Sequence, residues 1–268
     1  MPQNFIGTAL PLSEEGMSEV IDKLKVSIAE LWAVLNVETR SCGFLADRRP
    51  TILFERHVFS RETNHKFDVS NSDISNPQSG KYGSGGAHQY DRLNSAIKLD
   101  RIAALCSTSW GIGQLMGFNA KIAGYTDVQE MVTAMMASED QQLLGMAGEI
   151  IHNNLDRALQ RHNWAAFARG YNGPAYAKND YDTRLAAAYQ KYALGPLPDL
   201  LIRSAQIYLT YLEYHPGPAD GIMGRFTRSA LNDFQGEHNL PLTDVIDDSV
   251  ILTLKKEVDK LPIRLVGA

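Results

Sequence analysis

The chain has 268 residues, of which 44% are hydrophobic and 21% are charged. At roughly 100–200 residues per domain, this length allows one large domain, or a large domain followed by a small one. The 26 Lys and Arg residues face 31 Asp and Glu residues, which gives a formal net charge of −5 at pH 7. No overall positive field is present to attract nucleic acid, so no nucleic-acid partner is expected. Two cysteines are too few for a disulfide framework or a zinc cluster, and neither a metal nor another cofactor is expected.

The N-terminal segment does not resemble an export signal. Residues 1–16 contain no Lys or Arg and no apolar run of the length that a secretory signal needs. No later stretch approaches the ~18 apolar residues of a membrane span. We therefore expect a protein without a membrane anchor that is made in the cytoplasm and stays there until something else releases it.

The first half of the chain combines helical spacing with one long loop. Apolar residues over 20–37 recur with the spacing of one amphipathic helix. A short apolar run, 52–54, follows Pro50. Residues 70–90 are rich in Ser, Asn, Gly and Pro, which predicts a long loop of the kind that often carries function.

The chain beyond residue 92 is predicted to be helical almost throughout. Helical spacing recurs in a series of segments, at residues 93–105, 128–136, 144–159, 164–171 and 182–192. Few segments alternate in the manner of strands, so the fold is predicted to be mainly α. Two prolines and a glycine in residues 194–199 indicate a linker between a body, 1–193, and a tail, 200–268. The tail itself shows three helical patterns.

Glu38 lies on the apolar face of the first predicted helix. It follows Leu31 by seven residues and Leu35 by three, at the C-terminal end of that helix. Desolvation and the negative end of the helix dipole both disfavour its ionised form, so its pKa is expected to be raised. A carboxyl that stays protonated near neutral pH can act as a general acid. The alternative is a Glu that reaches solvent from a frayed helix end or pairs with Arg40.

Glu55 is the candidate for a second carboxylate. It follows the apolar run 52–54 directly, and two carboxylates flanking a bond are the usual arrangement for glycoside hydrolysis. The alternative is a structural ion pair with Arg56. Weaker candidates for the same role, around the predicted loop, are Asp68, Asp73 and Asp91.

The segment Trp110-Gly111-Ile112-Gly113-Gln114 is a candidate for ligand binding. Its glycines let a backbone approach a ligand closely, while Trp110 and Gln114 offer an aromatic ring and an amide, as sugar binding would require. It is neither a phosphate loop nor a dinucleotide-binding pattern, because no Gly-Lys-Ser/Thr follows it and no strand is predicted before it.

Larger blocks make the pattern specific. In order, the chain carries Val37-Glu38-Thr39, Gly43-Phe44-Leu45, Ile52-Leu53-Phe54-Glu55-Arg56-His57, and the blocks 109–119, 163–174, 176–179 and Tyr181-Asp182. Together these blocks, within residues 15–193, resemble the N-acetylmuramidase family of bacteriophage endolysins. More distantly, they are similar to goose-type lysozymes and lytic transglycosylases.

The resemblance implies a lysozyme-like helical domain that cuts the β-1,4 bond between N-acetylmuramic acid and N-acetylglucosamine. It implies Glu38 as the catalytic acid and Glu55 as the second carboxylate, with Thr39 in place of the family's Ser. It also implies that Gln114, Tyr171 and Asn172 line the sugar cleft together with Trp110. Whether configuration is retained or inverted depends on the separation of the two carboxylates.

The tail has a resemblance of its own. Residues 203–258 resemble the three-helix peptidoglycan-binding domain, on a Gly-Pro-Ala-Asp-Gly-Ile-Met-Gly block and an Asp-Phe-Gln end of the following helix. This implies bacterial peptidoglycan as the partner. The residues predicted to bind the wall are Asp220, Gly221, Gly224, Thr227, Phe234 and Gln235, although packing roles would explain most of them.

These resemblances predict a monomeric peptidoglycan hydrolase that lyses a bacterium from within. It would accumulate in the host cytoplasm and reach the wall only after a separate, holin-like pore opens the inner membrane. One alternative is a lytic transglycosylase, which would leave an anhydromuramyl product; another is a wall-binding protein without catalysis. A metal-dependent amidase or peptidase is disfavoured, because no His-Glu-x-x-His occurs among His57, His65, His88, His152, His162, His215 and His238.

Overall fold

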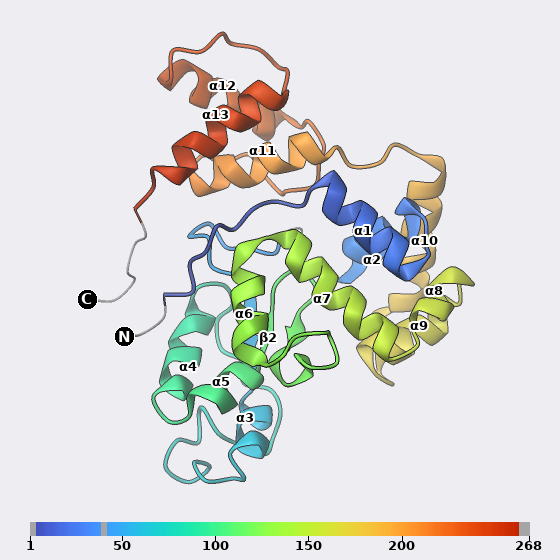
Figure 1. The fold of residues 1–268 in the computed structure, drawn as a ribbon, viewed down its shortest axis with the longest axis vertical. Coiled ribbons are helices and arrows are strands. Elements are labelled where there is room, and N and C mark those ends of the chain that lie inside the picture. Colours follow the sequence, from blue (N-terminus) through green and yellow to red (C-terminus); the bar gives the residue numbers. More distant parts are fainter. Residues whose placement is uncertain (1–3, 39–41, 263–268) are drawn as a thin grey trace.

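The computed structural model describes residues 4–38 and 42–262, and most of these residues lie in helices, as predicted. A large body forms one part of the molecule and a three-helix unit lies beside it (Figure 1). The helices of the body are α1 (Glu14–Leu24), α2 (Ile28–Glu38), α3 (Arg56–Glu62), α4 (His88–Ile97), α5 (Arg101–Cys106), α6 (Val128–Ala137), α7 (Glu139–His152), α8 (Asp156–Gln160), α9 (Trp164–Asn172) and α10 (Tyr181–Leu194), with short 3-10 turns at Gly117–Asn119 and Tyr176–Asn179. The helices of the unit are α11 (Leu200–Tyr211), α12 (Arg225–Glu237) and α13 (Asp248–Asp259).

The single helix predicted over 20–37 is wrong, because the chain breaks there into α1 and α2. Lys25 adopts a left-handed conformation, with φ of 54°, and ends α1. Ser27 and Glu30 then form a capping box: the Ser27 N–H donates to Glu30 Oε2 at 2.9 Å, and the Ala29 N–H donates to Ser27 Oγ at 3.2 Å. The helix predicted over 144–159 divides in the same way, at Asn154, whose φ is 57°.

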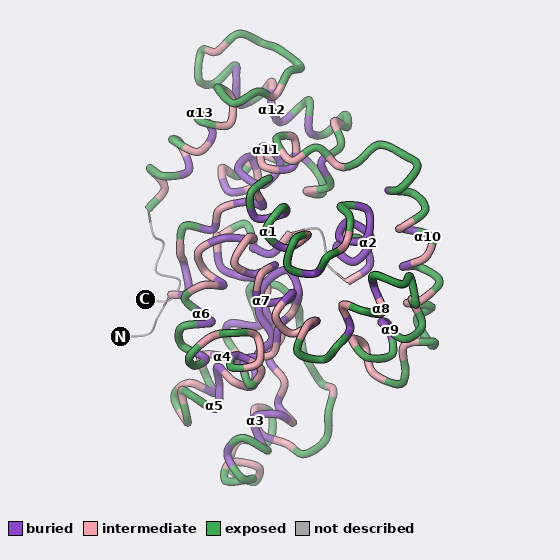
Figure 2. Tube along the Cα trace, turned by 45° about the vertical axis from the view of Figure 1, so that its right-hand side comes forward, coloured by how far each residue is buried: buried purple, intermediate pink, exposed green. Residues whose placement is uncertain are grey.

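Helix α2 is enclosed rather than amphipathic. Its residues are buried or half-buried except Ile28 at its start and Asn36 near its end, and α10 packs along it. Figure 2 shows α2 and much of α7 in the colour of buried residues, with exposed helices around them. Glu38 therefore sits at the end of a helix that the body surrounds.

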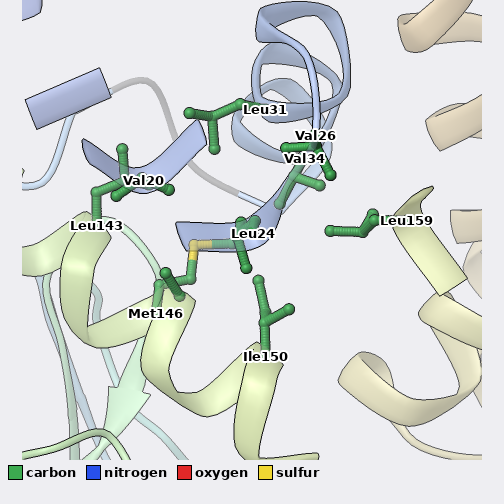
Figure 3. A pocket seen from close by; sticks show the side chains of 10 residues that line it. Val20, Leu24, Val26, Leu31, Val34, Leu143, Met146, Ile150 and Leu159 are labelled. Atoms are coloured by element: carbon green, nitrogen blue, oxygen red, sulfur yellow. The ribbon is translucent and has the colours of Figure 1, made fainter. Parts of the chain in front are cut away.

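Apolar side chains fix the relation of α1, α2 and α7. Figure 3 shows Leu24 of α1, Leu31 and Val34 of α2, and Met146 and Ile150 of α7 pointing toward one another. The space among them does not admit a water molecule. This apolar contact fixes the direction of α2 and therefore the position of its C-terminal end.

A small antiparallel sheet lies on the other side of α7. Its strands are β1 (Ile52–Phe54), β2 (Thr108–Trp110) and β3 (Leu115–Met116), in the order β1-β2-β3, with Ile52 opposite Trp110. The predicted loop before α4 is present, because residues 63–87 contain neither helix nor strand. The sheet brings residues around position 53 beside residues around position 110.

A buried ion pair joins the body to the three-helix unit. Arg203 of α11 reaches Glu139 at the start of α7, with a 2.8 Å contact from Nη2 to Oε1. Arg203 is 2% exposed and Glu139 is 0% exposed. Burial raises the pKa of Glu139, but the Arg203 guanidinium and two backbone N–H groups outweigh it, so the pKa is lowered overall. The boundaries 1–193 and 200–268 stay a prediction, and the two parts share this contact across them.

Replacing Arg203 should destabilise the whole chain. In Arg203→Met the Glu139 carboxylate stays buried without its cation, and we expect the free energy of unfolding to fall by about 3–5 kcal/mol. Denaturant unfolding measures the change. The control is Lys255→Met, which removes the exposed pair between Lys255 and Asp259 and should cost less than about 1 kcal/mol. A fall of less than about 1 kcal/mol in Arg203→Met would contradict the role given to this pair.

Candidate active site

A cleft of about 470 Å³ lies between the helices and the sheet of the body. Helices α2, α7, α9 and α10, with the residue directly after α7, contribute Glu38, Glu149, Asn153, Gly170, Tyr171, Asn172 and Tyr181. Helix α4 contributes Gln89. The sheet and its neighbouring loops contribute Cys42, Thr51, Ile52, Leu53, Glu55, Gly85, Gly86, Ser109, Gly111, Ile112, Gly113, Gln114 and Met116. Among the described residues that line the cleft there are three carboxyls and no Lys or Arg, so the cleft favours positive charge.

Glu38 enters the cleft from the end of α2. Its Oε1 accepts a hydrogen bond from Asn172 Nδ2 at 2.9 Å. Burial raises the pKa of Glu38, while the Asn172 hydrogen bond and the Arg184 guanidinium oppose the rise without cancelling it. The direction agrees with the sequence prediction. Arg40, the alternative partner, lies outside the described residues, as does Thr39.

Glu55 lines the same cleft from the N-terminal end of α3. Its Oε2 lies 3.1 Å from His57 Nδ1, whereas Arg56 turns away and donates from Nε to the Gln78 carbonyl oxygen at 3.1 Å. The ion pair with Arg56 considered as an alternative is therefore not formed. Burial raises the pKa of Glu55 overall, although His57 and a hydrogen bond with Tyr82 act in the opposite direction.

Gln114, Tyr171 and Asn172 all line the cleft, together with the two predicted carboxyls. The Tyr171 hydroxyl donates to the Gly113 carbonyl oxygen at 2.9 Å, which ties α9 to the loop after β2. Gln114 Nε2 donates to the Gly111 carbonyl oxygen at 2.8 Å. Both side chains are thus fixed before any ligand arrives.

Trp110 does not belong to the cleft, and its prediction as a sugar-binding residue needs correction. The side chain is 0% exposed, and its Nε1 donates to the Leu105 carbonyl oxygen at 3.2 Å. The glycines beside it serve packing as well as the cleft: a Cβ on Gly111 would lie 2.5 Å from the side-chain carbonyl carbon of Gln142. The aromatic ring is core, because β2 directs it toward α5 and away from the cleft.

The three weaker carboxylate candidates do not line the cleft. Asp68 accepts hydrogen bonds from Ser60 of α3 and from Ser75 of its own loop. Asp73 and Asp91 are exposed. Of the candidates for the second carboxylate that the sequence suggests, Glu55 is therefore the one that lines the cleft with Glu38.

Glu149 is a cleft carboxyl that the sequence analysis missed. It lies within a helical stretch that carries no recognisable motif, between the buried residues Met146 and Ile150. A carboxyl beside an apolar stripe was the signal available, the same signal that singled out Glu38. Without a neighbouring motif it could not be distinguished from an ordinary exposed Glu.

The predicted wall-binding residues mostly hold the three-helix unit together. Thr227, Phe234 and Gln235 are buried, which corrects their prediction as contact residues. The centre of the arrangement is Gln206 of α11, whose Nε2 donates to Asp220 Oδ1 at 3.0 Å and to Thr227 Oγ1 at 3.1 Å.

The remaining predicted residues lie on the turn before α12 and at the start of that helix. Gly221 is buried with φ of 71°, and its N–H donates to Gln206 Oε1 at 2.9 Å. Asp220 and Gly224 are exposed. Of the six residues, these two are free to meet a ligand.

The described residues contain neither a candidate metal cluster nor a candidate membrane span. Within residues 4–38 and 42–262, no three His, Cys, Asp or Glu side chains gather in a way that could hold a metal ion. Over the same residues, no helix has the length and apolar character needed to cross a membrane.

Comparison with known proteins gives two family matches and a related structure. Residues 27–193 match the N-acetylmuramidase family, and residues 199–254 match a peptidoglycan binding domain. The crystal structure of the endolysin of Burkholderia phage AP3 is similar, with a TM-score of 0.65 and 38% sequence identity, over 68% of this chain and 70% of that chain. No curated protein sequence matches the chain.

Removing the amide that contacts Glu38 should change how this carboxyl titrates. In Asn172→Ala the carboxylate loses a hydrogen bond to its charged form, so we expect the pKa of Glu38 to rise above its value in the unchanged protein. A carbon-detected NMR titration of the Glu38 carboxyl measures it. Asn153→Ala is the control, because Asn153 lines the cleft without a hydrogen bond to Glu38 and should leave the pKa unchanged. An unchanged or lower pKa in Asn172→Ala would refute the assigned contact.

Proposed function

The chain belongs to the N-acetylmuramidase family of glycoside hydrolases that act on peptidoglycan, and from that premise we propose that it hydrolyses the β-1,4 bond between N-acetylmuramic acid and N-acetylglucosamine. The observation that carries this proposal is that Glu38 and Glu55 line one cleft whose described lining residues include no Lys or Arg. Glycosidases generally use two carboxyl groups on either side of the bond that breaks.

Glu38 is the proton donor in this mechanism. Its raised pKa keeps a fraction of the carboxyl protonated at a pH where ordinary carboxyls are ionised. It protonates the glycosidic oxygen as the bond to the muramic sugar breaks. The Asn172 amide holds the carboxyl in one orientation and leaves its second oxygen for this transfer.

Glu55 stabilises the positive charge that develops on the sugar, or positions the water that attacks it. The absence of Lys and Arg from the described lining residues supports this role, because no cation in that lining repels the developing charge. His57, 3.1 Å from Glu55 Oε2, favours the ionised form of that carboxyl.

The three-helix unit supplies a second contact with peptidoglycan. Its family match supports wall binding, which would raise the concentration of substrate at the cleft. Of the residues predicted for this contact, the exposed Asp220 and Gly224 are those that we expect to touch the wall. In the cell, the protein would act as a monomer that lyses its host, reaching the wall from the cytoplasm once a holin-like pore has opened the inner membrane.

Neutralising Glu38 should abolish the activity. Glu38→Gln keeps the shape of the side chain but cannot donate the proton, so we expect the rate of clearing of peptidoglycan suspensions to fall at least about 100-fold. The control is Glu15→Gln, an exposed carboxyl on α1 that does not line the cleft, which should leave the rate unchanged. An undiminished rate in Glu38→Gln would favour a wall-binding protein whose clearing of the suspension has another cause.

The masses of the released products test the reaction type. Hydrolysis should give reducing muramic acid ends, because water is added across the broken bond. Mass spectrometry of digested peptidoglycan measures them. Fragments lighter by one water would instead identify a lytic transglycosylase.

A further inference from the structure

Two asparagine side chains accompany Glu149: Asn119 donates a hydrogen bond to it, and Asn153 lines the same cleft. On α7, Glu149 lines the cleft, and its Oε1 accepts a hydrogen bond from Asn119 Nδ2 at 2.6 Å. Asn153 caps the end of α7, where its N–H continues the helical pattern by donating to the Glu149 carbonyl oxygen at 3.0 Å, and it lines the same cleft. On a helix, residues four apart lie on one face with about 5–6 Å between their Cβ atoms. The two side chains therefore form one polar surface, which we call the α7 shelf.

The surroundings of Glu149 favour its protonated form. No Lys, Arg or His contributes to the electrostatics of this carboxyl among the described residues, so its charge would be uncompensated there. Tyr171 of α9 and Glu38 of α2 share its electrostatic surroundings, since Glu149 and Glu38 both raise the pKa of Tyr171. The other titratable side chains among the described residues that line the cleft are Cys42, Glu55 and Tyr181. Each of these groups would be neutral or negative. Burial raises the pKa of Glu149, and the Asn119 hydrogen bond only partly opposes the rise.

A protonated carboxyl and a primary amide make a specific combination. The first donates an O–H, and the second offers both an N–H and a carbonyl oxygen. A secondary amide in the trans form points its own N–H and C=O in opposite directions, so an amide seated between two side chains needs a donor on one side and an acceptor on the other. The acetamido groups of peptidoglycan sugars are secondary amides of this kind.

We propose that the α7 shelf is a subsite for an acetamido group of the bound glycan: Glu149 donates a hydrogen bond to its carbonyl oxygen, and the Asn153 side-chain oxygen accepts from its N–H. The proposal rests on the proposed function for the presence of N-acetylated sugars in the cleft. It assigns Glu149 to binding rather than to the bond that breaks, since Glu38 and Glu55 hold the catalytic roles. Asn119 acts through Glu149 as a positioning residue.

Affinity measurements can test the shelf apart from catalysis. We would measure, by calorimetry, the Kd of a peptidoglycan tetrasaccharide for full-length Glu38→Gln, which cannot consume it, and for the same protein with Glu149→Ala. Loss of one hydrogen bond should weaken binding about tenfold. Glu149→Gln in place of Ala retains an N–H donor of nearly the same shape and should recover most of the affinity. The control substitution is Glu15→Gln in the same background.

Two further measurements separate the shelf from a structural role. With the N-deacetylated tetrasaccharide, Glu149→Ala should bind as the background protein does, because the acetamido partner is gone. With the acetylated ligand, affinity should fall as pH rises through the pKa of Glu149, and Glu149→Gln should lack this part of the pH dependence. Glu55 also titrates in the cleft, but it is present in both proteins and contributes equally to both. Glu38 is already neutral in this background, and Tyr171 titrates well above the range used.

The proposal is overturned if Glu149→Ala leaves the Kd unchanged, or if it weakens the acetylated and deacetylated ligands equally while thermal unfolding stays normal. It is also overturned if the background protein does not bind the tetrasaccharide. Failure of the proposed function would look different: the unchanged protein would bind the ligand in a manner that depends on Glu149, yet release no new sugar ends.

Discussion

The architecture depends on one buried carboxylate, that of Glu139. It accepts from the Arg203 guanidinium, from the Leu12 N–H at 2.9 Å and from the Gly43 N–H at 2.8 Å. A buried charge is tolerated only where all its partners are in place. The N-terminal segment, the chain that follows the cleft carboxyl Glu38, α7 and α11 are therefore positioned together. The outline of the cleft and the attachment of the three-helix unit are two consequences of the same charge.

The cleft combines two conditions that chemistry at a glycosidic bond requires. Enclosure of α2 withdraws Glu38 from water and so raises its pKa, and the described lining offers no Lys or Arg to oppose positive charge on a sugar. Both conditions come from the body rather than from a few local side chains. α7 packs against α1, shares an apolar cluster with Leu31 and Val34 of α2, and presents Glu149 to the cleft.

Much of this could be predicted from sequence where the signal was local. The mainly helical fold and the position of Glu38 followed from apolar spacing, and Glu55 followed from its place after a short apolar run. The helix breaks were missed because a left-handed residue such as Lys25 or Asn154 leaves the apolar period intact. Trp110 was misassigned because glycines beside an aromatic ring look alike whether the ring meets a ligand or the core. Glu149 joins the cleft through contacts that span more than a hundred residues, and these leave no trace in local pattern.

The network around Gln206 bears on how this module is recognised in other chains. Its side chain links α11 to Asp220, Gly221 and Thr227, the residues that make the sequence pattern distinctive. The sequence pattern therefore reflects residues that hold the three-helix unit together. Two proteins can share this whole sequence pattern and still prefer different sugars or peptides. Exposed positions outside the pattern can differ between them without unfolding the unit. Preference for one kind of cell wall should be sought in that variable surface.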